Sequence, residues 1–170
     1  MILKSIYDIG GKICILENFT VLLQKEQLEI LTWRNNEKIR LMMNDTKLIS
    51  ETQHLSFINN LIDNNKKCFY KVSLDKSDSI GVVYLDKIQN EHAWLGIYSN
   101  PYSRVQQKGR LLMEVLFHLS FIDLKLKALF LEVRIENEKA IKLYLKYDFK
   151  TIKTEKDYYI MKKEYKNDNQ

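Results

Sequence analysis

The sequence predicts a mixed α/β fold (class α+β), in which a central twisted sheet of about seven strands carries helices on both faces. Segments with strand patterns alternate with segments of helical periodicity along the 170 residues. Apolar residues make up 45% of the chain, with only five glycines and one proline, as expected of a chain that buries a core. We therefore expect a single domain over residues 1–170, without repeats or low-complexity linkers.

The N-terminal third is predicted to contain one strand followed by helices. Residues 12–20 have strand character, and apolar residues at helical spacing predict a helix from Gln24 to Asn35. A short helical piece is expected over 37–43. Ser50 and Gln53 have the spacing of a capping box, which predicts the start of a third helix. The apolar face of that helix is expected to consist of Leu55, Ile58 and Ile62.

Three strand-like runs occupy the middle of the chain. They cover residues 68–74, 79–85 and 93–99 and are separated by turn-rich segments, which predicts an antiparallel meander. Cys14 and Cys68 lie inside apolar strand-like runs, so we expect them to be small core residues in a reducing compartment.

The C-terminal part is predicted to return to alternating helices and strands. A loop after Pro101 leads to Gly109 and a helix whose apolar stripe is Leu112, Val115, Leu116, Leu119 and Ile122. The next expected elements are a buried strand over 128–133, a helix from the N-cap Asn137 to about Lys146, and a hairpin of 149–153 with 158–163.

Charge and hydropathy exclude several classes of function. The net charge of +5 is spread along the chain and forms no dense basic stripe with interleaved aromatics, so no nucleic-acid partner is expected. No apolar run reaches the roughly 18 residues of a membrane span. Residues 1–9 lack the apolar core of a secretion signal, which predicts a cytoplasmic protein. No histidine lies in a cluster with metal-ligand spacing, and no metal is expected.

The stretch from His92 to Met113 is a candidate anion site. It holds Arg104, Lys108 and Arg110 and no carboxylate, and Gly109 stands where a helix is expected to begin. A helix N-terminus offers unpaired N–H groups to a pyrophosphate, and a glycine lets the backbone approach closely. Many helices follow a basic loop of this kind, so this segment alone does not identify the ligand.

A second motif extends the pattern. The segment from Leu131 to Phe149 combines a strand ending in Glu132 with a helix that reads N-x-x-A-I-x-L-Y-x-K-x-x-F. Together with the R-x-x-x-x-G loop, residues 93–153 resemble the acyl-CoA-binding half of the GNAT superfamily of N-acetyltransferases. The resemblance implies a GNAT-like three-layer fold and acetyl-CoA as the acetyl donor. Two departures are Gln107 and Asp148, which stand where the family usually has glycine.

The resemblance also implies the catalytic residues. Glu132 would be the general base and Tyr144 the general acid that protonates the leaving thiolate. The alternatives are an ion pair of Glu132 with Arg134 or a nearby lysine, and a purely core position for Tyr144.

The resemblance further implies how the cofactor is held. Asn137 would bond near the thioester, cap its helix, or do both. The pantetheine arm would lie along the strand that carries Gly96, which either opens that edge or marks a bulge. The implied cofactor-binding residues are Leu95, Ile97, Tyr98, Arg104, Gln107, Lys108, Gly109, Arg110 and Asn137.

The acceptor side resembles a narrower group, the nucleotide-sugar N-acetyltransferases of pseudaminic acid biosynthesis. The segments that carry this resemblance are Trp33-Arg34-Asn35, Met43 and His54-Leu55-x-Phe57-Ile58, with Asn36 replacing the group's histidine. It implies that Arg34 and His54 hold the nucleotide phosphate and that Met43, Phe57 and Trp94 line the sugar and base pocket. Trp33 is expected in the core, and a surface position on a helix is the alternative for His54.

The predicted reaction follows from these resemblances. Acetyl would pass from acetyl-CoA to the 4-amino group of UDP-4-amino-4,6-dideoxy-N-acetyl-β-L-altrosamine, by direct attack in a ternary complex, in the pathway that supplies pseudaminic acid for flagellin glycosylation. Two alternatives remain: an N-acetyltransferase for protein N-termini of the ribosomal-protein type, and a non-catalytic acyl-CoA-binding module. The sequence is compatible with a homodimer but does not determine the oligomeric state.

Overall fold

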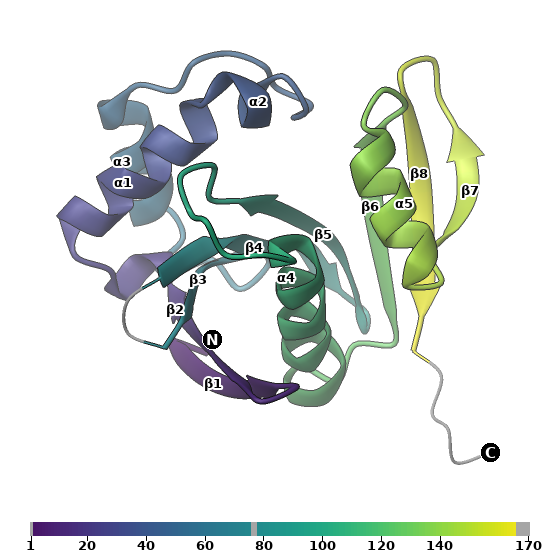
Figure 1. The fold of residues 1–170 in the computed structure, drawn as a ribbon, viewed down its shortest axis with the longest axis horizontal. Helices are drawn as coiled ribbons and strands as arrows, with labels where there is room; N and C mark the ends of the chain where they lie inside the picture. The colour runs from purple at the N-terminus through teal and green to yellow at the C-terminus, as the bar shows by residue number, and fades with distance from the viewer. Residues whose placement is uncertain (1, 76–77, 166–170) are drawn as a thin grey trace.

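In the computed structural model, which describes residues 2–75 and 78–165, one open sheet of eight strands has the order β1-β2-β3-β4-β5-β6-β8-β7 (Figure 1). This confirms the predicted mixed fold, with one strand more than the expected number of about seven. The strands are β1 (Lys4–Ile9), β2 (Lys12–Asn18), β3 (Cys68–Leu74), β4 (Asp78–Gln89), β5 (His92–Ser99), β6 (Ala128–Arg134), β7 (Lys150–Thr154) and β8 (Tyr158–Glu164).

The helices are α1 (Gln24–Asn35), α2 (Glu37–Arg40), α3 (Glu51–Asn59), α4 (Lys108–Phe117) and α5 (Glu138–Lys146). A 3₁₀ turn, η1 (Phe19–Val21), precedes α1, and a π-helical turn, η2 (His118–Asp123), continues α4. None of the helices in the described part of the chain is long and apolar enough to cross a bilayer.

Strand direction divides the sheet into two parts. Strands β1 to β5 pair antiparallel in sequence order, which confirms the predicted meander of β3, β4 and β5. β5 and β6 pair in parallel, and β6, β8 and β7 are again antiparallel. The loop and α4 therefore form the crossover between the two parts.

Helices cover both faces of the sheet, as predicted, because side chains alternate along each strand. In β4, Val83 and Leu85 lie in the core with α4, whereas Val82 and Tyr84 lie with residues of α1 and α3. Side chains of α5 pack onto the same core as α4, and Figure 1 shows α5 lying over β6 and β8. Trp33 is 1% exposed in the α1/α3 core, and Cys14 and Cys68 are both buried, as the sequence predicted.

Local signals placed the helix starts correctly. The backbone N–H of Gln53 donates to Ser50 Oγ at 3.2 Å, and Ser50 N–H donates to Gln53 Oε1 at 2.9 Å, which completes the predicted capping box. Asn137 caps α5 by accepting from Ala140 N–H at 3.2 Å. The expected orientations of two apolar residues were wrong: Ile62 is 58% exposed and Ile122 is 45% exposed. α3 ends before Ile62, and the wider π-helical turn carries Ile122 out of the stripe.

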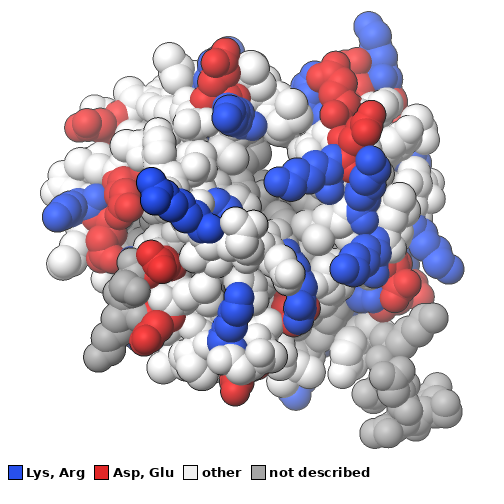
Figure 2. All heavy atoms as spheres, viewed as in Figure 1, with Lys and Arg blue, Asp and Glu red and all other residues white. Residues whose placement is uncertain are grey.

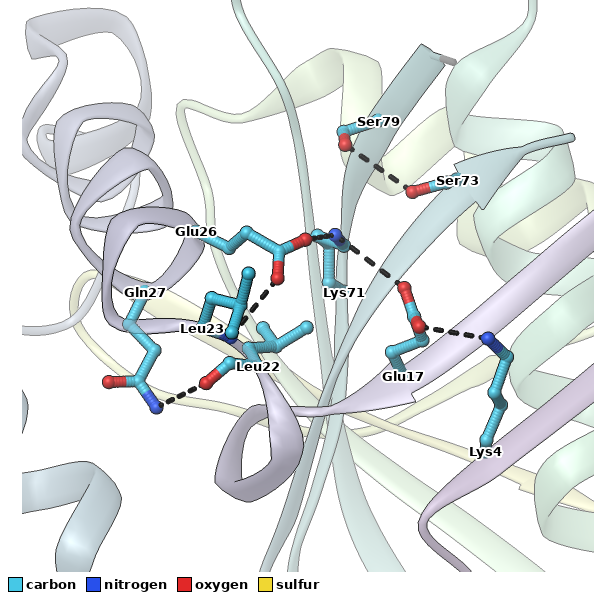
Figure 3. Close-up of polar contacts among 9 residues, drawn as sticks. All are labelled: Lys4, Glu17, Leu22, Leu23, Glu26, Gln27, Lys71, Ser73 and Ser79. Atoms are coloured by element: carbon cyan, nitrogen blue, oxygen red, sulfur yellow. Dashed lines mark hydrogen bonds and ion pairs between the residues drawn. The ribbon is translucent and has the colours of Figure 1, made fainter. Parts of the chain in front are cut away.

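A charge network around the buried Lys71 connects α1 to the sheet (Figure 3). Lys71, on β3, is 6% exposed and forms an ion pair with Glu26 of α1, and its Nζ lies 3.6 Å from a carboxylate oxygen of Glu17. The second oxygen of Glu26 accepts from the backbone N–H of Leu23 at 3.1 Å. One carboxylate thus joins the first turn of α1 to the buried ammonium group, which sets the position of the helix that carries Arg34.

Candidate active site

The sheet opens between β5 and β6. These strands pair only where His92, Ala93 and Trp94 face Ala128, Leu129 and Phe130. Beyond that point, residues 95–99 pair with β4 alone and residues 131–134 with β8 alone. A cleft of about 2170 Å³ enters this opening. Figure 2 shows a hollow near the centre of this face with Lys and Arg side chains around it.

The N-terminus of α4 forms one wall of the cleft. Arg104, Gln107, Lys108, Gly109 and Arg110 all line it, so the loop predicted to hold a pyrophosphate does open into the cavity. The first N–H groups of a helix have no partner within the helix and are free to bind an anion. A Cβ on Gly109 would lie 3.2 Å from Leu143 Cδ2, so the glycine also lets α5 approach α4 closely.

The three cations of this loop have different partners. Lys108 Nζ donates to the backbone oxygens of Asn100 at 2.8 Å and Ser103 at 2.6 Å, and burial lowers its pKa. Arg110 Nε donates to Glu114 at 2.8 Å. Arg104 is exposed and forms no ion pair with any described residue. Lys108 therefore stabilises the conformation of the loop. Of the three cations, the exposed Arg104 is the best placed to bind a phosphate that faces solvent.

Gln107 and Asp148, the two departures from the motif of the resemblance, have the same backbone conformation. Gln107, the N-cap of α4, has φ 60° and ψ 28°, and Asp148 has φ 62°. This left-handed region is the one in which glycine is favoured over other residues. Both positions therefore have a backbone conformation that favours glycine, although each carries a side chain.

Gly96 lies on the open edge of β5, as one of the two suggestions from the sequence had it, and it also makes room for a side chain of β4. It faces Tyr84 directly across β4 and β5, and a Cβ at Gly96 would lie 2.0 Å from Tyr84 Cζ and 2.1 Å from its hydroxyl oxygen. The glycine therefore leaves room for the Tyr84 phenol to lie across β5. The ring also stacks on Phe69, with centroids 4.5 Å apart.

Three tyrosines meet the cleft. Tyr84, Tyr98 and Tyr144 all line it, and burial is the main cause that raises the pKa of each. The proximity of Tyr84 raises the pKa of Tyr144 further. A phenol of this kind keeps its proton at neutral pH, as a general acid must. The Tyr144 ring also packs against Phe149, with ring centroids 5.7 Å apart, so the side chain belongs to the core and lines the cleft, and its role as general acid stays a prediction.

Glu132 projects from β6 into the cleft. Its carboxylate accepts a hydrogen bond from Asn44 Nδ2, which comes from the loop between α2 and α3. The alternative ion pair with Arg134 is not formed, because that guanidinium pairs with Glu136 at 3.7 Å. Sequence reasoning missed both Asn44 and Tyr84, since neither belongs to a motif and only the folded chain brings them to Glu132 and Gly96.

The acceptor side of the cleft comes from α1, α3 and the loop between α2 and α3. Arg34, Met43, His54 and Phe57 all line it, as the resemblance implied. Arg34 Nη2 donates to the backbone oxygen of Asp45 at 2.8 Å. Its Nη1 is buried and has no hydrogen-bond partner among the described residues, so it remains available to an anion in the cleft.

His54 differs from its predicted role. It is 5% exposed, so the surface position is wrong, and burial lowers its pKa. Its Nε2 lies 2.9 Å from the backbone oxygen of Gln27, an acceptor, so Nε2 carries the proton. The neutral ring then presents Nδ1 as a lone pair, which suits a donor on the ligand and does not suit the phosphate that the resemblance implied.

Trp94 is placed apart from the other predicted acceptor residues. It does not line the cleft, and its ring stacks on Phe130 with centroids 5.6 Å apart, beneath Lys87 Nζ at 4.8 Å. In the described residues, no three His, Cys, Asp or Glu side chains are grouped so that they could hold a metal ion.

Comparison with known proteins identifies the family. The acetyltransferase (GNAT) family matches residues 27–149. The chain is 33% identical over 144 residues to acetyltransferase PseH from two Campylobacter jejuni strains, covering 85% of this chain and 89% of each relative.

Solved structures agree with this result. The crystal structure of Campylobacter jejuni PseH matches with a TM-score of 0.76 and 28% identity, covering 90% of this chain and 99% of that one. The structure of PseH in complex with acetyl coenzyme A gives a TM-score of 0.75 at 27% identity, with the same coverage. A spermidine N-acetyltransferase from Vibrio cholerae in complex with CoA and spermine gives 0.79 at 22% identity, covers 89% of this chain and 95% of that one, and shares the fold.

These findings confirm three predictions from the sequence: the family, the GNAT fold and the enzyme class. The match spans α4 and β5 as well as the segments that carry Arg34 and Phe57, all of which meet the cleft. The chain belongs to the acetyltransferase (GNAT) family, whose enzymes take the acetyl group from acetyl-CoA.

Proposed function

We propose that this protein acetylates the 4-amino group of UDP-4-amino-4,6-dideoxy-N-acetyl-β-L-altrosamine, using acetyl-CoA, as a cytoplasmic step of pseudaminic acid biosynthesis. The observation that carries the proposal is the single cleft that joins a helix N-terminus and an open strand edge to Arg34, Met43 and Phe57. The similarity to acetyltransferase PseH over 85% of the chain supports the choice of pathway.

The cofactor would occupy the side of the cleft formed by α4, α5 and β5. Its pyrophosphate would meet the N–H groups at the start of α4, from Gln107 onward, with Arg104 at the rim. The pantetheine arm would extend along β5 from Leu95 to Tyr98, where β6 no longer pairs with the strand. In this arrangement the thioester would lie near Tyr144 and Asn137, which line the same cleft.

The acceptor would enter from the side of α1 and α3. A diphosphate requires a cation, and the unpartnered Nη1 of Arg34 supplies one. Phe57 and Met43 supply apolar surface for the methyl-bearing face of a 6-deoxy sugar. His54, with its lone pair on Nδ1, would accept a hydrogen bond from a hydroxyl or amide of the acceptor. Trp94 lies outside the cleft and has no part in this pocket.

The chemistry requires a base, an acid and correct positioning. The neutral amine attacks the thioester carbon, so a C–N bond forms and the C–S bond then breaks. The proton lost by the amine goes to Glu132, and the leaving thiolate takes the proton of the Tyr144 hydroxyl. Solvent then restores both groups. Direct transfer predicts that no acetyl-enzyme accumulates when acetyl-CoA is supplied without acceptor.

The test is release of free thiol from acetyl-CoA in the presence of the nucleotide sugar, beside a peptide with a free N-terminus. Wild type should turn over only the nucleotide sugar, and Glu132→Gln and Tyr144→Phe should each lower kcat roughly 100-fold or more. Turnover of the peptide alone would show that the acceptor is a protein N-terminus and not the nucleotide sugar. Saturable CoA binding without turnover of either acceptor would indicate a non-catalytic module.

A further inference from the structure

One hydrogen bond crosses the cleft between its two halves. Asn44, in the loop between α2 and α3, donates through Nδ2 to Oε2 of Glu132 on β6, although the residues are 88 positions apart in the chain. Both residues line the cleft. The loop that bounds the acceptor side thus touches the group that we propose as the general base.

The loop that carries Asn44 is fastened at three backbone positions. Arg34 Nη2 donates to the oxygen of Asp45 at 2.8 Å, and Arg40 Nη1 donates to the oxygen of Thr46 at 2.5 Å. Asn35 forms a reciprocal pair with the backbone of Ile49, at 2.8 and 3.0 Å. The side chains of α1 and α2 therefore fix the backbone on which Asn44 stands, which explains why α2 ends at Arg40 rather than continuing to residue 43 as expected.

We propose that Asn44 is a positioning residue for Glu132, an inference that rests on the proposed function. By donating to Oε2, the carboxamide fixes the carboxylate and leaves Oε1 free to accept the amine proton. The amine of the acceptor would then meet a carboxylate oxygen whose place relative to the thioester is fixed.

The place of Asn44 in the fold is compatible with a positioning role. Asn44 belongs to an exposed loop and not to the core, so its loss should change turnover far more than folding.

Three variants test the role by kinetics. Asn44→Leu keeps the branched shape of the side chain but has no donor, and kcat should fall roughly 10- to 100-fold, the range expected for a hydrogen bond to a charged group, with KM for acetyl-CoA unchanged. Asn44→Gln retains the carboxamide and should recover part of the loss. Lys47→Ala, in the same loop, is the matched control and should behave as wild type, because Lys47 does not line the cleft.

A double-mutant cycle separates positioning from a structural role. In the Glu132→Gln background, Asn44→Leu should lower kcat little further, because its partner is already lost. Additive losses, an unchanged kcat in Asn44→Leu, or a melting temperature that falls in parallel with kcat would each overturn the proposal. A wild-type kcat in Glu132→Gln would overturn it as well, together with the assignment of the base.

A measurement without acceptor keeps this test independent of the substrate. In ¹H–¹⁵N spectra of the full chain, the side-chain NH₂ signal of Asn44 should shift when Glu132 is replaced by Gln, while that of Asn60 stays in place. If the nucleotide sugar is not turned over but this shift is seen, the proposed acceptor is wrong and the Asn44–Glu132 contact stands. An unmoved Asn44 signal would refute the contact itself.

Discussion

Gln107 provides a direct test of the backbone argument at the candidate pyrophosphate site. With φ 60° it occupies a region that costs a residue with a Cβ about 1–2 kcal/mol. Glycine removes that cost but loses about 0.5–1 kcal/mol through its more flexible unfolded state. Gln107→Gly also removes a long, exposed hydrogen bond of 3.3 Å to Arg110 Nη1, which contributes a few tenths of a kcal/mol.

The balance predicts that Gln107→Gly stabilises the fold by roughly 0.5 kcal/mol, or about 1–2 °C in Tm for a chain of this size. Urea unfolding and thermal melting of the variant beside wild type measure this directly. Asp148→Gly should gain less, because aspartate tolerates the left-handed region better than glutamine does. Gln107→Ala keeps the backbone cost and should give no gain.

CoA binding extends the same test. Since the proposed pyrophosphate contacts are backbone N–H groups of α4, Gln107→Gly should bind CoA at least as tightly as wild type by calorimetry. A destabilised Gln107→Gly protein, or a Gln107→Ala protein that gains as much as the glycine variant, would refute the reasoning from backbone strain.

Three further predictions concern the cleft and its supports. Gly96→Ala should destabilise the fold by about 1–3 kcal/mol, because its Cβ would lie 2.0 Å from Tyr84 Cζ. In urea unfolding, adding Tyr84→Val should recover most of that loss. An equal loss of stability in both backgrounds would contradict the steric explanation. The hydrogen bond from Lys71 lowers the pKa of Glu26 below its unfolded value, so its stabilisation of the fold is complete above about pH 4.3 and is lost as pH falls through the folded pKa. Glu26→Gln should therefore flatten the decline in unfolding free energy between about pH 5 and pH 3. Parallel curves of unfolding free energy against pH for the variant and wild type would disprove the contribution of Glu26. Lys108→Ala should lower Tm, because the loop loses two hydrogen bonds. Arg104→Ala should leave Tm unchanged and weaken CoA binding about threefold to tenfold. Melting curves and calorimetry of both variants measure these effects, and a lower Tm in Arg104→Ala or an unchanged Tm in Lys108→Ala would contradict the two roles.

The sequence predicted most of the elements because their signals are local. The capping box of Ser50 and Gln53 and the N-cap Asn137 are read from neighbouring residues, and the structure contains both. The edge strand β1 (Lys4–Ile9) was missed, because its residues alternate in burial without an apolar run and the strand is defined by pairing with β2.

The parts of the site that escaped prediction depend on distant contacts. The end of α2 is determined by side chains of α1 that bond to the following loop, and the place of Tyr84 is determined by its register against Gly96. The contact of Asn44 with Glu132 joins residues 88 positions apart that only the folded chain brings together. For Trp94, the residue pattern predicted the strand correctly, but the ring packs on Phe130 and does not line the cleft, although the resemblance had implied that it would.

The short pairing between β5 and β6 has a consequence for how the enzyme responds to its cofactor. Only three residue pairs join the two parts of the sheet along this seam, so the region from β6 to β8 is held less firmly than a full ladder would hold it. A pantetheine arm lying along β5 would act as the missing segment of that ladder. Acetyl-CoA would then stabilise the sheet as well as supply the acetyl group. Amide hydrogen exchange in β5 and β6 would therefore slow when the cofactor binds, in the absence of acceptor.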